Sequence, residues 1–134
     1  MAGVRPVPVE DDRDTAGFWE AARRRVLVVR ACTDCGAVLH MPTARCGYCG
    51  SWEGQWKPVA PTGRLYSWTN VVHQVHEAFE VPYTVVLVEL DDAPDARLVG
   101  YLPGTPELKP EQAMEVEWQE LEDGTVLPQW RTVS

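Results

Sequence analysis

The clearest pattern of apolar and polar positions lies in the second half of the chain. In the segment MEVEWQEL, residues 114–121, Met114, Val116 and Trp118 alternate with acidic or amide side chains. A period of two is typical of a strand with one buried and one exposed face. Four other segments after Gly63 are rich in β-branched and aromatic residues and are separated by turn-forming residues. The five predicted strands are residues 63–72, 81–90, 96–102, 114–121 and 125–133.

The first thirty residues follow a different pattern. The segment FWEAARRR carries apolar side chains near helical spacing, beginning at Phe18. Asp14 or Thr15 is placed to cap a short helix there. The stretch Val26–Val29 is short, apolar and β-branched, which predicts a strand. The prolines and glycine of KPVAPTG, residues 57–63, then mark a junction before the predicted strands.

All four cysteines lie between the predicted helix and the junction, in the sequences CTDCG and CGYCG. They are Cys32, Cys35, Cys46 and Cys49. Two Cys-x-x-Cys pairs place four thiolates in the tetrahedron that zinc prefers, and a shell of four thiolates leaves no open position for water. We therefore expect a structural metal that supplies most of the folding free energy of this module. Iron in a rubredoxin-like electron carrier is the alternative, which a red colour of the purified protein would reveal.

Together these elements predict a mostly β protein with a short N-terminal helix, a four-cysteine zinc ribbon and a five-stranded OB-fold barrel. A short, one-turn helical segment is expected at Glu107–Gln112, before the fourth barrel strand. The predicted parts are residues 1–30 (helix and lead-in strand), 31–56 (zinc ribbon) and 57–134 (OB-fold domain).

Composition agrees with a globular protein: the chain has 134 residues, of which 45% are hydrophobic and 24% charged. The longest apolar runs, such as Val26–Val29 and Val85–Val88, are far shorter than the roughly 20 residues that cross a bilayer. The opening MAGVRPVPVEDD has no apolar core of a signal peptide. We therefore expect a cytoplasmic protein without membrane contact, in which paired cysteines bind metal rather than form disulfides.

The net charge of −8 is distributed unevenly along the chain. Residues 1–64 carry nine Arg or Lys against seven Asp or Glu, hence +2, and residues 65–134 carry three against thirteen, hence −10. Proteins that bind nucleic acids gain most of their affinity from basic faces. An OB-fold and zinc-ribbon module that binds nucleic acid is therefore the disfavoured alternative.

The candidate contact residues are aromatic, basic or histidine side chains. Phe18 and Trp19 point in different directions on a helix, so one can pack inward while the other contacts a partner or an acyl chain. The basic side chains can dock phosphates or an acidic partner. The candidates for acyl-CoA or partner contact are Phe18, Trp19, Arg23, Arg24, Arg25, Lys57, Arg64 and His73. Nucleophile-elbow, phosphate-loop and dinucleotide motifs are absent from the sequence, so no catalytic residue is predicted.

The order of these parts resembles a family of zinc-ribbon plus OB-fold proteins once classed as a domain of unknown function. They are also described as acyl-CoA-binding proteins with a rubredoxin-like zinc ribbon. The resemblance runs from about Phe18 to Trp130 and is carried by the two cysteine knuckles together with SWTNVVH and PYTVVLVEL.

The resemblance implies an accessory role beside a thiolase-superfamily enzyme, including the sterol-carrier-protein-type thiolases. The larger partner would supply the catalytic residues, and the small subunit would help to form the acyl-CoA site. The most concrete version is a retro-aldolase of steroid side-chain degradation, a carbon–carbon lyase, and other versions perform thiolysis or acyl transfer. The helix and ribbon are expected to face the ligand or the shared interface.

Overall fold

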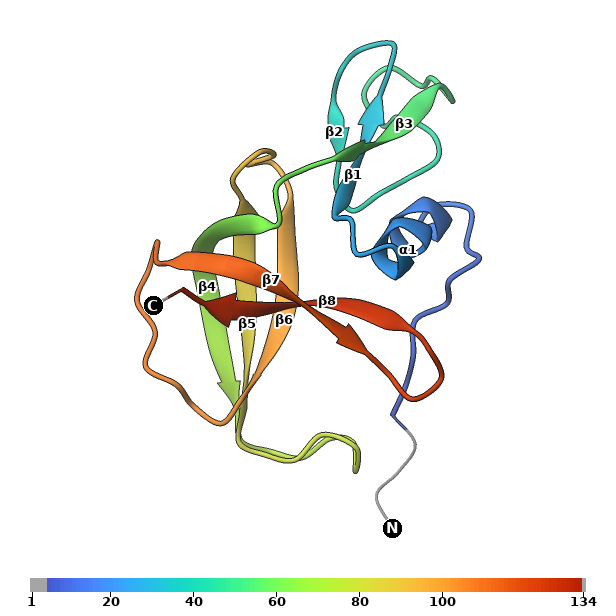
Figure 1. The fold of residues 1–134 in the computed structure, drawn as a ribbon. Helices are drawn as coiled ribbons and strands as arrows, with labels where there is room; N and C mark the ends of the chain where they lie inside the picture. The colour runs from blue at the N-terminus through green and yellow to red at the C-terminus, as the bar shows by residue number, and fades with distance from the viewer. Residues whose placement is uncertain (1–4, 134) are drawn as a thin grey trace.

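The computed structural model describes residues 5–133, which form a small three-stranded ribbon, one helix and a five-stranded barrel (Figure 1). The prediction of a mostly β chain with a short N-terminal helix is confirmed. The elements in chain order are α1 (Ala16–Arg23), β1 (Val28–Cys32), β2 (Val38–Leu39), β3 (Gly54–Pro58), β4 (Thr62–Val71), β5 (Tyr83–Leu90), β6 (Arg97–Pro103), β7 (Ala113–Glu120) and β8 (Val126–Thr132).

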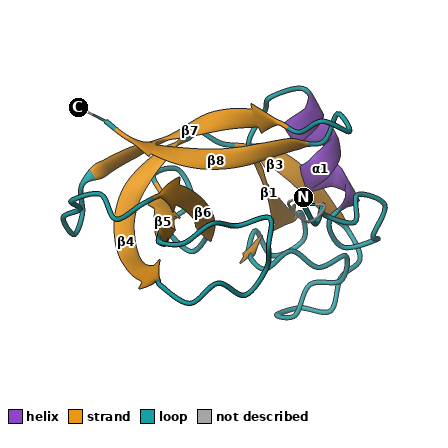
Figure 2. Ribbon diagram, turned by 90° about the horizontal axis from the view of Figure 1, so that it is seen from below, coloured by secondary structure: helices purple, strands orange, loops and turns teal. Residues whose placement is uncertain are grey.

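Helix α1 buries Ala21 and Ala22 and lies beside the β7–β8 hairpin (Figures 1 and 2). The expected capping of this helix by a side chain is wrong. Thr15 occupies the N-cap position, but its side chain makes no capping hydrogen bond. The Asp14 carboxylate instead accepts a hydrogen bond of 2.7 Å from the backbone N–H of Ala44. This contact ties the start of the helix to the ribbon.

The ribbon is an antiparallel sheet with strand order β2-β1-β3. Strand β1 pairs along its whole length with β3, from Val28 opposite Pro58 to Cys32 opposite Gly54. The first cysteine knuckle begins at Cys32, the last residue of β1, and the second lies between β2 and β3; the two meet at one end of this sheet. Gly36 and Gly50 follow the knuckles with φ of 77° and 78°, a left-handed conformation that glycine adopts without strain.

The barrel has the strand order β6-β5-β4-β7-β8, and all of its neighbouring strands are antiparallel. Its two outer strands approach each other, because the N–H of Tyr101 in β6 donates to Oε1 of Gln129 in β8 at 3.0 Å. Gly100 permits this closure, since a Cβ there would lie 2.6 Å from Cδ1 of Trp130. The arrangement is the five-stranded OB-type barrel that the sequence predicts.

The one-turn helix expected at Glu107–Gln112 is absent, and the segment is an irregular loop with a turn at residues 110–111. The backbone N–H of Glu111 donates to the carbonyl of Leu65 at 2.8 Å, and the N–H of Leu65 donates to the carbonyl of Gln112 at 2.9 Å. The loop backbone therefore pairs with β4, and within the loop the N–H of Gln112 donates to the carbonyl of Lys109 at 3.3 Å. Glu111 has a φ of 66°, which lies outside the helical region.

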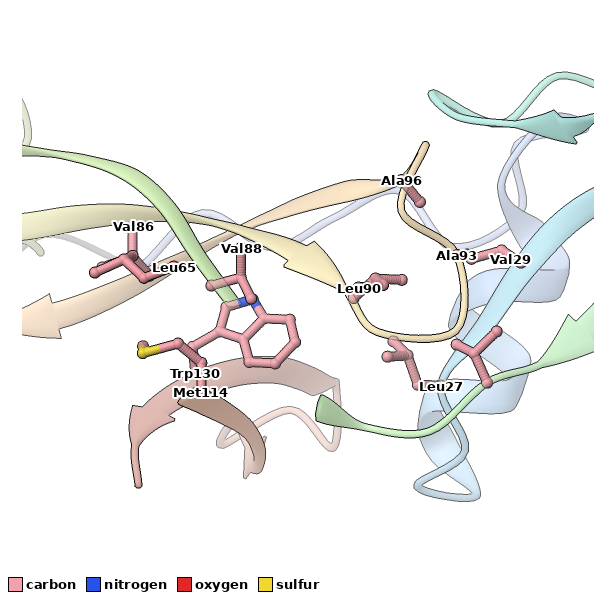
Figure 3. Close-up of a cluster of buried hydrophobic side chains, with 11 residues drawn as sticks. Leu27, Val29, Leu65, Val86, Val88, Leu90, Ala93, Ala96, Met114 and Trp130 are labelled. Carbon is pink, nitrogen blue, oxygen red and sulfur yellow. The ribbon is translucent and has the colours of Figure 1, made fainter. Parts of the chain in front are cut away.

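One hydrophobic core fills the barrel and continues into the lead-in to the ribbon (Figure 3). Its buried members are Leu27, Val29, Val59, Leu65, Val86, Val88, Leu90, Ala93, Ala96, Met114 and Trp130. Strand β5 supplies alternate buried residues along its whole length, as a strand with one face on the core should. Because Leu27 and Val29 belong to the same cluster as the barrel residues, the root of the ribbon is anchored in the barrel. Within residues 5–133, no helix has the length and apolarity that crossing a membrane requires.

Candidate functional site: a thiolate cluster and an apolar cleft

The four cysteine sulfurs converge at the end of the ribbon, and all lie within 4.8 Å of one another. The Sγ atoms of Cys32 and Cys49 are 3.6 Å apart, and those of Cys35 and Cys46 are 3.7 Å apart. A tetrahedron with zinc–sulfur bonds of about 2.3 Å has sulfur–sulfur edges of about 3.8 Å. The cluster therefore fits a four-thiolate zinc site in which all four positions are taken by protein.

Backbone N–H groups of the second knuckle donate hydrogen bonds to Sγ of Cys46, which favours its thiolate form. The N–H of Cys49, followed by that of Tyr48, lowers the pKa of Cys46 to about 6. The Ser51 amide acts in the same direction on Cys49, but the neighbouring Cys32 thiol and burial outweigh it and raise the pKa of Cys49 to about 12. Four thiolates thus oppose each other's ionisation, and a divalent cation would remove that repulsion. The chemistry such an ion supplies here is a structural crosslink.

Hydrogen bonds between the knuckles hold the cluster on both sides. Ser51 donates its hydroxyl to the carboxylate of Asp34 and accepts a bond of 3.0 Å from the N–H of Glu53. The N–H of Thr33 in the first knuckle donates to the carbonyl of Glu53 at 3.1 Å. The Ser51–Asp34 and Thr33–Glu53 contacts join residues far apart in sequence, so the second knuckle is held against the first independently of the sulfurs.

A second feature lies where the helix, the ribbon and the barrel meet, which is an apolar cleft of about 580 Å³. This volume is within the range of roughly 300–1,000 Å³ of small-molecule sites. Its apolar and aromatic walls come from α1, β1, the segment after β2, β3, β6 and β8. They include Phe18, Trp19, Val28, Met41, Trp56, Val99 and Leu127.

Close packing of the helix on the ribbon sets the shape of this cleft. A Cβ on Gly17 would lie 2.0 Å from Nε1 of Trp56, so only a glycine lets the helix approach that ring. The rings of Phe18 and Trp19 meet edge to face, with centroids 5.0 Å apart. This contact fixes their orientation at the cleft wall.

Two polar side chains of the cleft, those of His40 and Arg97, already have partners. Nε2 of His40 lies 2.7 Å from the carbonyl oxygen of Arg97, which joins the ribbon to the barrel. The Arg97 guanidinium lies 3.4 Å from the Glu89 carboxylate and stacks 3.9 Å from the ring centroid of Tyr66. Arg30 differs from these groups because it has no carboxylate partner among residues 5–133.

Comparison with known proteins was made with this geometry established. Residues 19–53 match the domain described as "ChsH2, rubredoxin-like zinc ribbon domain", and residues 56–119 match "ChsH2, C-terminal OB-fold domain". A chain of the solved structure "Ltp2-ChsH2(DUF35) aldolase" is 35% identical, with a TM-score of 0.82 over 96% of this chain and 98% of that chain. The chain belongs to the DUF35 family that includes ChsH2.

Two other relatives of this DUF35 chain differ in how much they resemble it. A "Probable enoyl-CoA hydratase alpha subunit" of Thermomonospora curvata is 39% identical over 130 residues. Those residues are 96% of this chain but 40% of the relative, so the chain spans less than half of that protein's length. A DUF35 protein of unknown function from Sulfolobus solfataricus has 12% identity and a TM-score of 0.56 over 75% of both chains, which is a likeness of fold.

The structure divides the predicted contact residues of this DUF35 chain into two sets. Phe18 and Trp19 line the cleft, where they lie with residues of the ribbon and barrel. The basic candidates and the histidine candidate lie outside the cleft lining: Arg23, Arg24, Arg25, Lys57, Arg64 and His73. The exposed His73 lies between β4 and β5. Figure 1 shows the loop between these two strands at the end of the barrel away from the ribbon.

The charged candidates also differ in their partners. Arg23 pairs with Glu10 at 3.0 Å and Arg25 with Glu120 at 3.3 Å, so both are partly neutralised. Arg24 is exposed and has no ion pair within the described part of the chain. The helix end therefore presents one free guanidinium rather than three.

Several cleft residues escaped the sequence prediction because they come from separate elements. Trp56, Val99 and Leu127 lie on three different strands that only the fold brings together. Arg30 belongs to the basic side chains that the sequence offers for docking an anion, and its single charge follows the β-branched pair of residues 28–29 in a buried strand. No sequence pattern identifies Met41 as a cleft residue, because it lies in the loop between the knuckles.

Proposed function

We propose that the chain is a non-catalytic accessory subunit whose cleft receives the acyl group of an acyl-CoA beside a thiolase-superfamily enzyme. The most concrete version is the small subunit of an aldolase that cleaves a steroid side chain. The observation that carries the proposal is the apolar cleft of about 580 Å³ between helix, ribbon and barrel. An acyl group needs such a surface, and the likeness to a chain of the Ltp2-ChsH2 aldolase extends over almost the whole cleft-forming chain.

The chemistry of the cleft supports binding rather than catalysis. No carboxylate, thiol or amine among residues 5–133 lines it, and its hydroxyl groups are those of Thr15 and Tyr101. The histidine that lines the cleft, His40, is hydrogen-bonded through Nε2 to the carbonyl oxygen of Arg97 at 2.7 Å. A general acid–base pair or a nucleophile with its base requires such groups within hydrogen-bonding reach of the substrate. The enzyme partner would therefore supply the reacting groups.

The rim of the cleft supports contact with a second protein. Met41 and Val99 line the cleft and are 77% and 65% exposed. Large apolar side chains gathered at the edge of a hollow are typical of surfaces that a partner covers. The zinc site at the far end of the ribbon would hold β1, β2 and β3 together and thereby keep this rim in place.

Co-expression of the chain with a thiolase-like protein encoded beside it tests the proposal. We expect a stable complex, and acyl-CoA cleavage by the mixture but not by the small chain alone. Val99→Asp places a charge on the rim and should weaken the complex at least tenfold. Val72→Asp is the matched control, because Val72 is 76% exposed on the loop after β4, far from the cleft.

Full activity of the thiolase-like chain alone, with no complex formed, would remove the accessory role. Equal loss of complex with Val99→Asp and Val72→Asp would remove the cleft rim as the interface. Metal analysis of the same preparation distinguishes zinc from the iron of an electron carrier.

A further inference from the structure

Arg30 is held rigidly at the wall of the cleft. It is the third residue of β1, and its guanidinium carbon lies 5.6 Å from the ring centroid of Trp56. Its Nη2 donates to the carbonyl of Ala44 at 3.2 Å. A Cβ on Gly54 would lie 2.7 Å from the Arg30 Cζ, so the glycine opposite makes room for the group. The aromatic ring, the carbonyl and the space beside the glycine therefore hold the Arg30 guanidinium in one position.

The positive charge of the Arg30 guanidinium is not compensated by a carboxylate of the described residues. No carboxylate of residues 5–133 lies within 4.0 Å of Arg30. Its Nε is the one buried side-chain nitrogen or oxygen in that part of the chain without a hydrogen-bond partner. Because Arg30 also lines the cleft, its guanidinium brings to that wall a charge that no carboxylate of the described residues balances, and such a charge favours an oxygen acceptor from outside the chain.

We propose that Arg30 recognises an oxygen acceptor carried by the apolar group in the cleft, and that a carboxylate binds it most strongly. This inference rests on the proposed function, because it places the acyl group of an acyl-CoA in the cleft. It adds a substrate class, namely acyl groups that bear oxygen at a position remote from the thioester. A carboxylate neutralises the guanidinium and accepts two parallel hydrogen bonds, whereas a ketone accepts bonds without neutralising it.

Two other polar side chains of the cleft, those of Arg97 and Gln129, have partners within the chain. Arg97 has the Glu89 carboxylate at 3.4 Å, which already balances its charge. Gln129 accepts from the N–H of Tyr101 at 3.0 Å and donates to the side chain of Gln119 at 3.2 Å. Of the two guanidinium groups of the cleft, Arg30 is therefore the one whose charge is left for an anionic ligand.

A series of ligands tests this with the unaltered, zinc-loaded chain. The probes are dodecanoyl-CoA, its counterpart with a carboxylate in place of the terminal methyl, and a counterpart with a ketone near that end. Calorimetric titration measures each affinity, and Trp19 and Trp56 at the cleft wall provide a fluorescence signal. We expect the carboxylate to bind about tenfold or more tightly than the methyl, with the ketone between them, because a charge-assisted hydrogen bond is worth that factor.

Substitutions at Arg30 and Arg131 test which side chain causes the preference for the carboxylate probe. Arg30→Met keeps an apolar stem of similar reach and should make the carboxylate and methyl affinities equal. Arg30→Lys keeps the charge but loses the planar donor pair, so part of the preference should return. Arg131→Met removes an exposed guanidinium on β8, outside the cleft lining, and should leave the series unchanged.

The outcomes separate this inference from the proposed function. If all three probes bind the wild-type chain equally, Arg30 does not select oxygen, yet the cleft remains an acyl site. If the preference survives Arg30→Met, the recognition lies elsewhere and the assignment is wrong. If no probe binds to the chain or to its complex with the enzyme partner, the acyl-binding role and the Arg30 assignment both fail.

Discussion

The ribbon and the barrel are both small antiparallel sheets, but they are stabilised in different ways. The barrel encloses a cluster of eleven buried residues in which β5 contributes every second side chain. The ribbon has a separate cluster of Cys32, Leu39 and Cys46, with Ala37 packed against it. Two of those three buried residues are expected metal ligands. The barrel therefore has a core that can support folding, whereas the ribbon has almost none without its metal.

The position of the cleft gives this difference a functional meaning. One wall belongs to the barrel and the other to the ribbon and helix, so the shape of the cleft depends on both kinds of stabilisation. The root of β1 is held by the barrel core through Leu27 and Val29. Its far end, at Cys32, is held by the thiolate cluster. A change in either region should therefore alter the cleft in a distinguishable way.

Removal of the metal should have the largest effect on this comparison. Chelation, or Cys46→Ser, is expected to unfold the ribbon beyond the root of β1 while the five barrel strands stay folded. Zinc binding contributes on the order of 10 kcal/mol or more in small zinc modules, which the ribbon cluster cannot replace. Amide NMR spectra would show loss of dispersed ribbon signals and retention of barrel signals.

Return of zinc should restore the ribbon signals of the chelated protein but not those of Cys46→Ser. Loss of the barrel signals on chelation would show that the two regions fold as one unit. An unchanged spectrum after complete metal removal would show that the thiolate cluster does not stabilise the ribbon.

Truncation of the barrel core should have the next largest effect. Trp130 is 2% exposed and fills the centre of the barrel, so Trp130→Ala is expected to cost about 3–5 kcal/mol of unfolding free energy. Trp52→Ala is the matched control, because Trp52 is 58% exposed on the ribbon. Chemical denaturation measures both variants, and equal losses of stability would contradict the placement of the core.

The sequence predicts the barrel better than the cleft for a physical reason. A strand with one buried face has apolar and polar residues that alternate along the sequence. In β7 the apolar residues of this alternation are Met114, Val116 and Trp118. The cysteine spacing likewise predicts the metal ligands of the ribbon, because each Cys-x-x-Cys knuckle is formed by residues that are close in sequence. The cleft has no local pattern, since Phe18, Trp56 and Leu127 meet only through the relative placement of helix, ribbon and barrel.

Local interpretation fails where longer-range contacts compete with it. The segment at residues 107–112 has the composition of a helical turn, but its backbone bonds to Leu65 of β4 instead. Asp14 is a good capping residue by type, yet its carboxylate is taken by the N–H of Ala44 in the ribbon. In both cases tertiary hydrogen bonds compete with the local structure that the sequence indicates.

The contact between helix and ribbon provides a test of intermediate size. Gly17→Ala would place a Cβ 2.0 Å from Nε1 of Trp56, so the helix or the ring must move. We expect a net loss of about 1–3 kcal/mol, although alanine is the better helix former by about 1 kcal/mol. Thermal unfolding measures the loss, and acyl-CoA titration measures the accompanying change in the cleft.

Gly47→Ala is the control for this substitution, because nothing lies within 4 Å of a Cβ at Gly47. It should change neither stability nor acyl-CoA affinity appreciably. Full wild-type behaviour of Gly17→Ala would show that the helix is not packed tightly on the ribbon.

The β7–β8 hairpin supplies the smallest expected effect, which depends on pH. The backbone N–H of Thr125 donates to Oδ1 of Asp123 at 3.0 Å and, with the Thr125 side chain, lowers the pKa of Asp123 below its ordinary 3.8. A lowered pKa in the folded state stabilises the protein above pH 3.8, and this contribution disappears as the pH falls through the folded value. Asp123→Asn keeps the acceptor and should therefore flatten a slight decline in melting temperature between neutral pH and about pH 3. A decline of equal steepness in the two proteins would show that other carboxylates cause it.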